Sequence, residues 1–288
     1  MELEIKNLTK IYGKKTILNN MSLRFRNGIT GILAPNGSGK TTFLKILATV
    51  STPSSGNVYL EGKDIFKIGK NYRDIIGYLP QNFGVYPNQT AEKFLKYFAV
   101  LKGIDEDKID YRIDELLELV SLKHVKKKKL KTFSEGMKQR IGIAQALLND
   151  PKILILDEPT VSLDPDERIK FRDFLIQIGE SRMVILSTHI VSDLEAAATD
   201  IVFMKDGELL SFITPEEALT EVEGKVYEFI TDLKGVGELK EKYVVSHSMN
   251  KKQGIAVRVI SEDIQKRAVL VEPNLEDVYI YYYQVKAH

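Results

Sequence analysis

The 288-residue chain contains no cysteine and no tryptophan, and its formal net charge is only +1. Without cysteine it cannot form disulfides, zinc–thiolate sites or a catalytic thiol, although this says little about compartment. No apolar run approaches the roughly 18 residues that a membrane-spanning helix needs. The opening residues, MELEIKNLTKIYGKK, are charged and lack the apolar core of a signal peptide. The balanced charge gives no general attraction to nucleic acid or lipid, so we expect a cytoplasmic protein that acts at a membrane only through a partner.

What remains is the composition of an ordinary globular protein, with 43% hydrophobic and 28% charged residues. The length allows one large domain or two smaller ones. Because the pattern of apolar segments shifts near residue 220, we expect a main domain at 1–220 and an accessory lobe at 221–288.

Residues 31–47, which read GILAPNGSGKTTFLKIL, combine the end of an apolar run, a turn of small residues and an apolar-periodic segment. This order predicts a strand, a glycine-rich loop and a helix, whose free N–H groups and positive end bind phosphate. Lys40 would reach the β- and γ-phosphates, and the Thr41 hydroxyl would be a ligand of Mg²⁺. The alternative is a turn that binds nothing, but a lysine in such a loop has no packing role. The residues expected to hold the nucleotide are Asn36, Gly37, Ser38, Gly39, Lys40, Thr41 and Thr42.

One position departs from the pattern G-x-x-x-x-G-K-[ST], because Ala34 stands where the first glycine is usual. A methyl group there would strain the turn if the backbone needed a positive φ. The second half of the pattern is intact, so we still expect a working phosphate site.

The main domain otherwise reads as strands and helices arranged around this loop. An antiparallel, strand-rich entry is expected over 2–30, and buried strands over 75–79, 153–156 and 183–189. Helices are expected at 43–50, 169–178 and 191–198, and a hairpin turn at Asp206-Gly207. Residues 82–150 change character, and their amphipathic segments at 94–101, 109–122 and 134–148 predict an inserted helical subdomain.

The accessory lobe is expected to contain strands at 226–230, 243–246 and 255–260 and a short helix near 273–279. The predicted fold class is therefore α/β. It has a P-loop NTPase core with a mixed, largely parallel sheet and helices on both faces. An N-terminal antiparallel β subdomain, the inserted helical subdomain and a small C-terminal α+β lobe complete it.

Polar side chains follow two of the predicted buried strands. The run 152–156 leads into Asp157 and Glu158, and the run 183–186 leads to His189. Open α/β sheets place ligands at the carboxyl ends of their strands, where the phosphate loop also lies. Asp157 can hold Mg²⁺ through water, Glu158 can orient or deprotonate an attacking water, and His189 can contact the γ-phosphate. Each residue alone is a weak signal, and together with the loop they predict ATP hydrolysis.

Residues 133–140, FSEGMKQR, start a predicted helix, where a serine hydroxyl and free amides can bind an anion. Alone they would be an N-capped helix. Lying shortly before ILILDEP, they resemble the signature, usually written LSGGQ, of the nucleotide-binding subunits of ATP-binding cassette (ABC) transporters. Phe133, Glu135 and Met137 differ from that signature, while Ser134 and Gly136 match it.

This resemblance covers residues 1–220 and implies roles for further residues. Tyr12 resembles the aromatic residue that stacks on adenine, and Gln81 resembles the glutamine that touches Mg²⁺ and senses the membrane partner. Asp164 resembles the aspartate that crosses the dimer, and His189 the switch histidine. In such a head-to-tail homodimer, each ATP with its Mg²⁺ lies between the phosphate loop of one subunit and Ser134 and Gly136 of the other.

The resemblance also implies membrane partners. Residues 81–95 resemble the segment that docks a cytoplasmic helix of an integral membrane permease, with Tyr86 as the expected contact. Residues 221–288 resemble the C-terminal extension of bacterial export-type cassettes, whose permease is a separate polypeptide. The chain would then lie peripherally on the cytoplasmic face of the membrane and power export. Multidrug, peptide-antibiotic, and polysaccharide or lipid cargoes all stay open, and the lobe could regulate, dimerise or brace the permease.

Two other functions fit parts of the sequence. A soluble cassette ATPase acting on DNA or ribosomes would carry a long coiled-coil insertion or two cassettes in one chain, and this sequence has neither. We therefore expect no nucleic-acid partner. A nucleotide-sensing module without turnover would not need the intact Asp157, Glu158 and His189.

Overall fold

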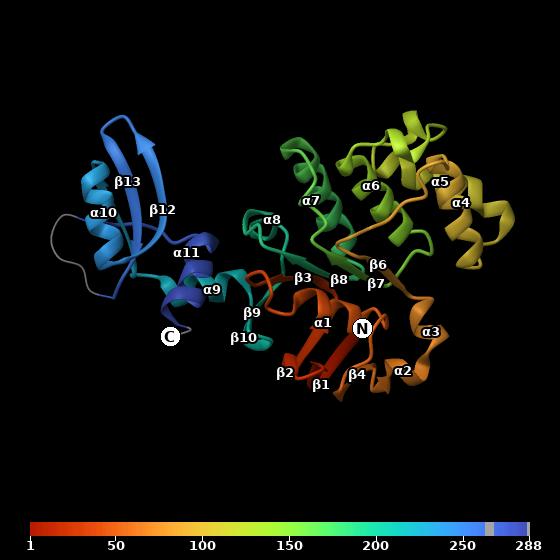
Figure 1. Ribbon diagram of the computed structural model, residues 1–288, viewed down its shortest axis with the longest axis horizontal. Helices are drawn as coiled ribbons and strands as arrows, with labels where there is room; N and C mark the ends of the chain where they lie inside the picture. The colour runs from red at the N-terminus through yellow and green to blue at the C-terminus, as the bar shows by residue number, and fades with distance from the viewer. Residues whose placement is uncertain (263–267, 287–288) are drawn as a thin grey trace.

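A six-stranded sheet runs through the middle of the computed structural model, which describes residues 1–262 and 268–286 (Figure 1). Neighbouring strands are parallel, except that β10, at one edge of the sheet, runs antiparallel to β9. In spatial order the strands are β10 (Glu208–Ile213), β9 (Asp200–Lys205), β3 (Gly28–Leu33), β8 (Met183–Thr188), β7 (Ile153–Asp157) and β6 (Ile76–Leu79).

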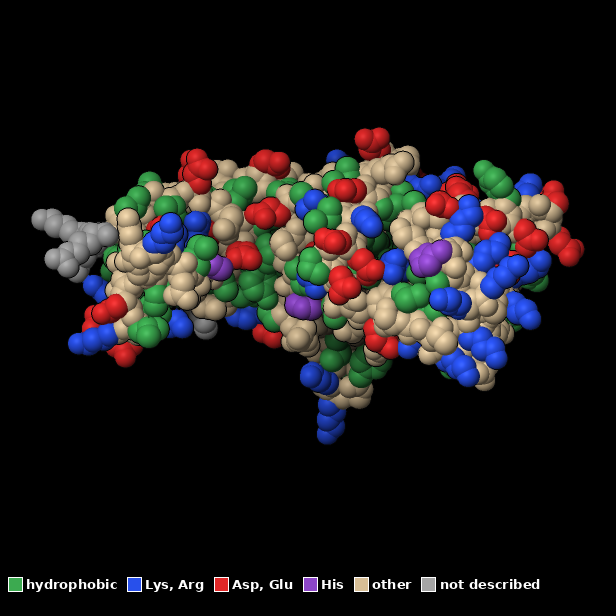
Figure 2. Space-filling model, turned by 90° about the horizontal axis from the view of Figure 1, so that it is seen from above, with side chains coloured by type: hydrophobic (Ala, Val, Ile, Leu, Met, Phe, Trp, Pro, Cys, Tyr) green, Lys and Arg blue, Asp and Glu red, His purple; other side chains and the backbone are tan. Residues whose placement is uncertain are grey.

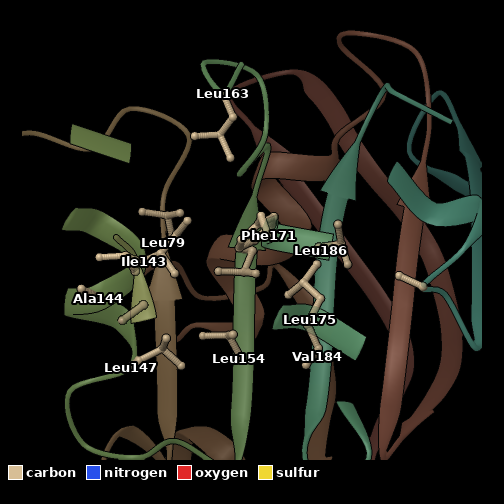
Figure 3. Packing of buried hydrophobic residues seen from close by; sticks show 14 of the residues in the cluster. Leu79, Ile143, Ala144, Leu147, Leu154, Leu163, Phe171, Leu175, Val184 and Leu186 are labelled. Carbon is tan, nitrogen blue, oxygen red and sulfur yellow. The ribbon is translucent and has the colours of Figure 1, made fainter. Parts of the chain in front are cut away.

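Both faces of this sheet are buried, which explains the unbroken apolar runs of its central strands. Side chains alternate between two cores: Ile153 and Ile155 of β7 belong to one, and Leu154 and Leu156 to the other. Helix α1 (Lys40–Leu47) packs in the first core, whereas α6 (Glu135–Ala146) and α7 (Pro165–Gly179) pack in the second (Figure 3). Helices α1 and α6 therefore lie on opposite faces of the sheet.

An antiparallel sheet covers the outer side of α1 (Figure 1). Its strands alternate buried and exposed residues, as a sheet with one solvated face should. Its order is β2 (Lys15–Arg26), β1 (Glu2–Tyr12), β4 (Ser55–Leu60) and β5 (Lys63–Asp64), followed by the short helices α2 (Ile65–Ile68) and α3 (Lys70–Arg73).

A helical segment connects β6 to the neighbouring parallel strand β7. Thr90 caps its first helix by accepting a hydrogen bond from the amide of Lys93 at 3.2 Å. The segment contains α4 (Ala91–Leu101), α5 (Glu106–Leu119), the 3₁₀ turns η1 (Lys123–Val125) and η2 (Leu130–Thr132), and α6.

One predicted helix is largely wrong. The segment 191–198 is helical only in α8 (Ser192–Glu195). The chain leaves the helix because Thr199 bonds to Ile29 at the start of β3, through its amide (2.8 Å) and its hydroxyl (3.0 Å), and this leads it into β9.

The C-terminal part builds a separate antiparallel sheet and then returns to the main domain. The sheet order is β12 (Val244–Lys251), β13 (Gly254–Ile260), β11 (Val226–Thr231) and β14 (Val269–Leu270). The expected strands are present, and a helix that was not predicted, α10 (Leu233–Lys242), lies between the first two and contains Gly235 and Gly237. Helix α9 (Pro215–Val222) links this sheet to β10, and α11 (Leu275–Ile280) leads into a π-helical turn, η3 (Tyr281–Val285).

The returning segment packs in the same buried cluster as the central sheet. Leu275, Val278 and Tyr282 join Ile201 and Phe203 of β9 there. The division near residue 220 stays a prediction, because the last residues of the chain pack with the core of the first part. In the described part of the chain, no helix is long and apolar enough to cross a membrane.

Candidate nucleotide site

The loop between β3 and α1 has the conformation of a phosphate cradle. Gly37 and Gly39 have φ values of 83° and 100°, which favour glycine. A Cβ atom at Gly39 would also lie 2.8 Å from the carbonyl oxygen of Ile17. The first turn of α1 carries no acidic residue, so its positive end is free for an anion. The buried Ser38 hydroxyl has no hydrogen-bond partner within the described structure, as expected of a group that awaits a ligand oxygen.

A hairpin from the far edge of the sheet braces this loop. The turn Asp206-Gly207 joins β9 to β10, as predicted, and the Gly207 amide donates to the carbonyl of Ser38 at 3.0 Å. The Gly207 carbonyl accepts from the amide of Asn19 at 2.8 Å. The loop is therefore held from outside its own strand and helix.

Lys40 lies at the bottom of the cradle and is 7% exposed. Its ammonium group donates to the carbonyls of Ala34 and Pro35 and lies 3.7 Å from Oε1 of Glu158. Burial lowers the pKa of Lys40, and the nearby carboxylates of Glu158 and Asp157 oppose that shift. Lys40 is thus placed where a phosphate would replace the loop carbonyls.

Ala34 fits the loop without strain. It is fully buried and is not among the residues with positive φ in the described structure. The methyl group packs in the core beneath α1. Alanine in place of the usual first glycine therefore does not strain the backbone of the loop.

The structure brings Asp157, Glu158 and His189 together at the carboxyl edge of the sheet. Nδ1 of His189 lies 2.9 Å from Oε2 of Glu158, so the Glu158 carboxyl group stands between His189 and Lys40. Glu158 is 5% exposed, whereas the His189 side chain is 47% exposed. Asp157 is fully buried, and its Oδ2 has no hydrogen-bond partner in the described structure. An unpartnered carboxylate oxygen beside a phosphate cradle fits a water-bound Mg²⁺.

Sequence reasoning missed Ser187, which organises this cluster. Its hydroxyl donates to Oδ1 of Asp157 at 2.7 Å and accepts from the amide of Glu158 at 3.1 Å. The amide of Glu158 also lies 3.1 Å from the carbonyl oxygen of Ser187. A hydroxyl residue two positions before His189, at the end of a buried strand, was the available signal.

Glu158 has an unusual backbone conformation, with φ at 52°. A residue with a Cβ rarely occupies this left-handed region, and such strain clusters at functional sites. The bend directs the chain away from the end of β7 while the amide of Glu158 stays bonded to β8. It therefore places the Glu158 carboxyl group between Lys40 and His189.

Gln81 and Thr41 complete the predicted metal ligands. Thr41 and Thr42 are half-buried in the first turn of α1, whereas Asn36 of the loop is exposed. Gln81 is exposed just after β6, and together with Glu158, Gln139 and Ser162 it lines a cavity of about 430 Å³. Gln81 thus opens onto the same cavity as the Glu158 carboxyl group.

The predicted signature residues are not brought to this cluster. Ser134 is exposed and caps α6 by accepting from the amide of Met137 at 3.1 Å. Gly136 is required by close packing, since a Cβ atom there would lie 2.7 Å from the carbonyl oxygen of Ser162. Asp164 is exposed at the start of α7. Within the described residues, no hydrogen bond or ion pair joins these three to the phosphate loop.

Tyr12 ends β1 and is 50% exposed. Nζ of Lys10 lies 4.8 Å from the centre of its ring, and its hydroxyl lies 3.5 Å from that of Ser51. The ring is half exposed, and its stacking on adenine stays a prediction.

A phosphate cradle on a parallel sheet, with a buried lysine and a strand-end carboxylate pair, defines a P-loop nucleotide hydrolase. The family model described as "ABC transporter" matches residues 18–161, and the chain belongs to this family. It is 35% identical to the ABC transporter ATP-binding protein YxlF of Bacillus subtilis (strain 168), over 96% of this chain and 98% of that protein. It is 36% identical to the bacitracin transport ATP-binding protein BcrA of Bacillus licheniformis, over 88% of this chain and 83% of that protein.

Solved structures agree with this assignment. A dimeric ATP-binding cassette in a post-hydrolysis state, bound to ADP and Pi, matches with a TM-score of 0.68 at 28% identity, over 74% of this chain and 98% of that chain. These findings confirm the predicted α/β cassette fold. The chain is an ATP-binding, ATP-hydrolysing subunit of an ABC transporter.

Proposed function

We propose that two copies of this chain pair head to tail, hydrolyse Mg²⁺-ATP at two equivalent sites and drive a permease carried on separate polypeptides. The observation that carries the site assignment is the Glu158 carboxyl group, which lies 3.7 Å from Lys40 and 2.9 Å from His189. It stands beside two buried polar atoms, Ser38 Oγ and Asp157 Oδ2, that have no partner in the described structure.

In this proposal, each residue of the cluster has one task. The amides of residues 36–42 and the ammonium of Lys40 bind the phosphates. Glu158 orients the attacking water and accepts its proton, while His189 holds the Glu158 carboxyl group and contacts the γ-phosphate. Mg²⁺, which neutralises charge on the β- and γ-phosphates, would be held by Thr41, Gln81 and, through water, Asp157.

The second copy supplies the residues that the first cannot bring to its own loop. Ser134 caps α6 and Gly136 lies in its first turn, on the face of the sheet opposite α1. Asp164 occupies the N-cap position of α7, and the starts of both helices can bind an anion. ATP would favour the closed dimer because only that state adds these contacts to the phosphates. Support comes from the dimeric cassette that this chain resembles.

The permease would dock beside α4. Tyr86 and Tyr97 are 49% and 45% exposed, and their rings meet edge to face with centres 5.9 Å apart. Lysine and arginine side chains gather at this end of the molecule (Figure 2). An exposed aromatic pair beside the Gln81 segment would carry movement of the permease to the cavity that Gln81 and Glu158 share. The chain would then lie on the cytoplasmic face of the membrane and power export; the similar protein BcrA is named for bacitracin transport.

The Glu158→Gln variant tests the assignment. It keeps the size and burial of the side chain but removes the proton acceptor, so we expect ATP turnover to fall at least about 100-fold while ATP still binds. With ATP, the variant should accumulate as a dimer on size-exclusion chromatography, and without ATP it should elute as the monomer.

The matched control is Glu115→Gln on α5, whose carboxylate pairs with Arg112 of the same helix at 2.8 Å. It should keep wild-type turnover. Undiminished hydrolysis in Glu158→Gln would overturn the role of Glu158. An ATP-free dimer of the same abundance would overturn the proposal that ATP closes it.

A further inference from the structure

The tail of the chain reaches the phosphate loop through one side chain. The Tyr283 hydroxyl lies 2.6 Å from the carbonyl oxygen of Leu33 and 3.0 Å from that of Met204. Leu33 is the last residue of β3 and precedes Ala34, where the loop begins. The contact with Leu33 joins residues 250 positions apart in the sequence, and the phosphate-loop motif gives no indication of it.

The surrounding rings hold Tyr283 in this position. Tyr282 stacks on Phe203 with ring centres 4.1 Å apart and planes 3° from parallel. Tyr279 lies 4.6 Å from the ring of Tyr283, one turn earlier in the tail. Phe203 is the β9 residue paired with Leu33, so the stack and the hydrogen bond act on the same end of the β3–β9 pair. Burial raises the pKa of Tyr283, so the hydroxyl keeps its proton and remains a donor.

The other end of this segment is fixed to the C-terminal sheet. Asp277 of α11 is fully buried and pairs with Arg258 of β13, with an Nη2–Oδ2 distance of 2.5 Å. Ser246 of β12 also donates to the Asp277 carboxylate. Polar contacts therefore fix α11 to two strands of the lobe, and the same segment reaches the end of β3 through Tyr283.

The contact with Leu33 matters because the next carbonyls of the loop contact Lys40. Ala34 and Pro35 both accept from its ammonium group. A shift at the end of β3 would therefore move the loop carbonyls that hold Lys40 before phosphate replaces them.

We propose that Tyr283 is a positioning residue of the nucleotide site, which fixes the entrance of the phosphate loop and makes its affinity for ATP depend on docking of the C-terminal tail. The proposal rests on the assignment of residues 36–42 to phosphate. It gives the lobe a role that the sequence left open, because a partner that displaces the tail would weaken nucleotide binding.

The test compares Tyr283→Phe with Tyr282→Phe. Both variants lose one hydroxyl from the same turn and keep their rings, but the Tyr282 hydroxyl faces Lys286 at 3.4 Å rather than the loop. Binding of a fluorescent ATP analogue to the full chain should weaken about three- to tenfold in Tyr283→Phe, the range expected for one hydrogen bond. It should stay within about twofold of wild type in Tyr282→Phe, while kcat at saturating ATP stays unchanged in both.

Hydrogen exchange without nucleotide provides the second measurement. The amides of residues 34 and 36–40 should exchange faster in Tyr283→Phe than in wild type, and at the wild-type rate in Tyr282→Phe. Unchanged exchange in Tyr283→Phe, or equal losses of affinity in both variants, would overturn the proposal. Since this measurement uses no ATP, it tests the Tyr283 contact even if the wild-type chain fails to bind the analogue, a result that would overturn the proposed site instead.

Discussion

The phosphate loop and the signature segment contain the two sets of predicted ATP ligands, and the fold treats them in opposite ways. Around the loop, Lys40, Asp157 and Glu158 are buried and connected to one another. In the signature segment, Ser134 is exposed and bonds only within its own helix start in the described structure. The loop and the segment belong to helices on opposite faces of one sheet.

This difference indicates which region can bind nucleotide alone. The loop side has unpartnered buried atoms and a lysine already in place, so it should bind ATP in a single chain. The signature side offers an exposed hydroxyl and free amides, which gain value only when another molecule brings phosphate to them. In the proposed dimer, one chain would therefore carry halves of two sites and no complete one.

The largest expected effect comes from splitting the two halves between chains. Lys40→Ala and Ser134→Arg should each reduce ATPase activity at least about 100-fold, because each homodimer lacks one half of both sites. Mixed in equal amounts, the two variants should recover about a quarter of wild-type activity, since half of the dimers are mixed and each has one intact site. Steady-state ATPase assays on the mixture measure this recovery.

The control for that experiment is a mixture of Lys40→Ala with the double variant Lys40→Ala/Ser134→Arg, which has no intact loop and should stay inactive. Mixed dimers that form without any recovery would show that the halves do not complement across the interface.

Removing the Ser187 hydroxyl should have a smaller effect, confined to the phosphate-loop side of the site. Ser187→Ala loses the hydrogen bonds to Asp157 and to the amide of Glu158, so we expect kcat to fall about tenfold. Ser181→Ala, an exposed serine just before the same strand, is the control and should leave kcat unchanged. If Ser187→Ala instead impaired ATP binding to the same degree as turnover, Ser187 would support the loop rather than the catalytic pair.

ATP binding on the phosphate-loop side of the site should also depend on alkaline pH. The pKa of Lys40 lies below its ordinary 10.5 because of burial. Phosphate binding needs the ammonium form, so ATP affinity should fall several-fold as pH rises through that lowered pKa, before 10.5. The pH dependence should be absent in Lys40→Met, measured with a fluorescent nucleotide.

Lys102 provides the check on this interpretation, since burial lowers its pKa to about 8 and it lies on the helical segment instead. An alkaline loss of affinity that vanished in Lys102→Met, and not in Lys40→Met, would contradict the assignment to Lys40.

The smallest effect is expected at Ala34. Because its φ is not positive and its methyl group is buried in the core, Ala34→Gly should change ATP affinity less than about twofold, while the greater chain freedom of glycine should lower stability by about 0.5–1 kcal/mol. Nucleotide titration and urea unfolding measure the two quantities. A tenfold change in affinity, about 1.4 kcal/mol, would show that this position shapes the cradle.

Much of the fold followed from local patterns. The loop and the strands ending at Asp157 and before His189 were predictable because each motif is contiguous, and parallel strands bring their carboxyl ends to one edge. The structure places Lys40, Asp157, Glu158 and His189 together as the sequence predicted, although their individual roles stay proposals.

The remaining features depend on distant contacts. Helix α10 was not predicted, because Gly235 and Gly237 have low helix propensity; Asp232 caps this helix by accepting from the amide of Gly235 at 2.9 Å. The return of Tyr283 to Leu33 joins chain segments with no shared motif. Neither Ser187 nor Tyr283 carried a local signal strong enough to separate it from ordinary core residues.

The left-handed backbone of Glu158 limits how this family member can change. Glycine would relax a φ of 52°, but removing the carboxylate would leave the buried ammonium of Lys40 without its partner at 3.7 Å. The proposed proton-accepting role gives a further reason to keep glutamate at this strained position. Selection for stability and selection for ATP turnover would therefore act on different parts of the same residue, the first on its backbone and the second on its carboxyl group.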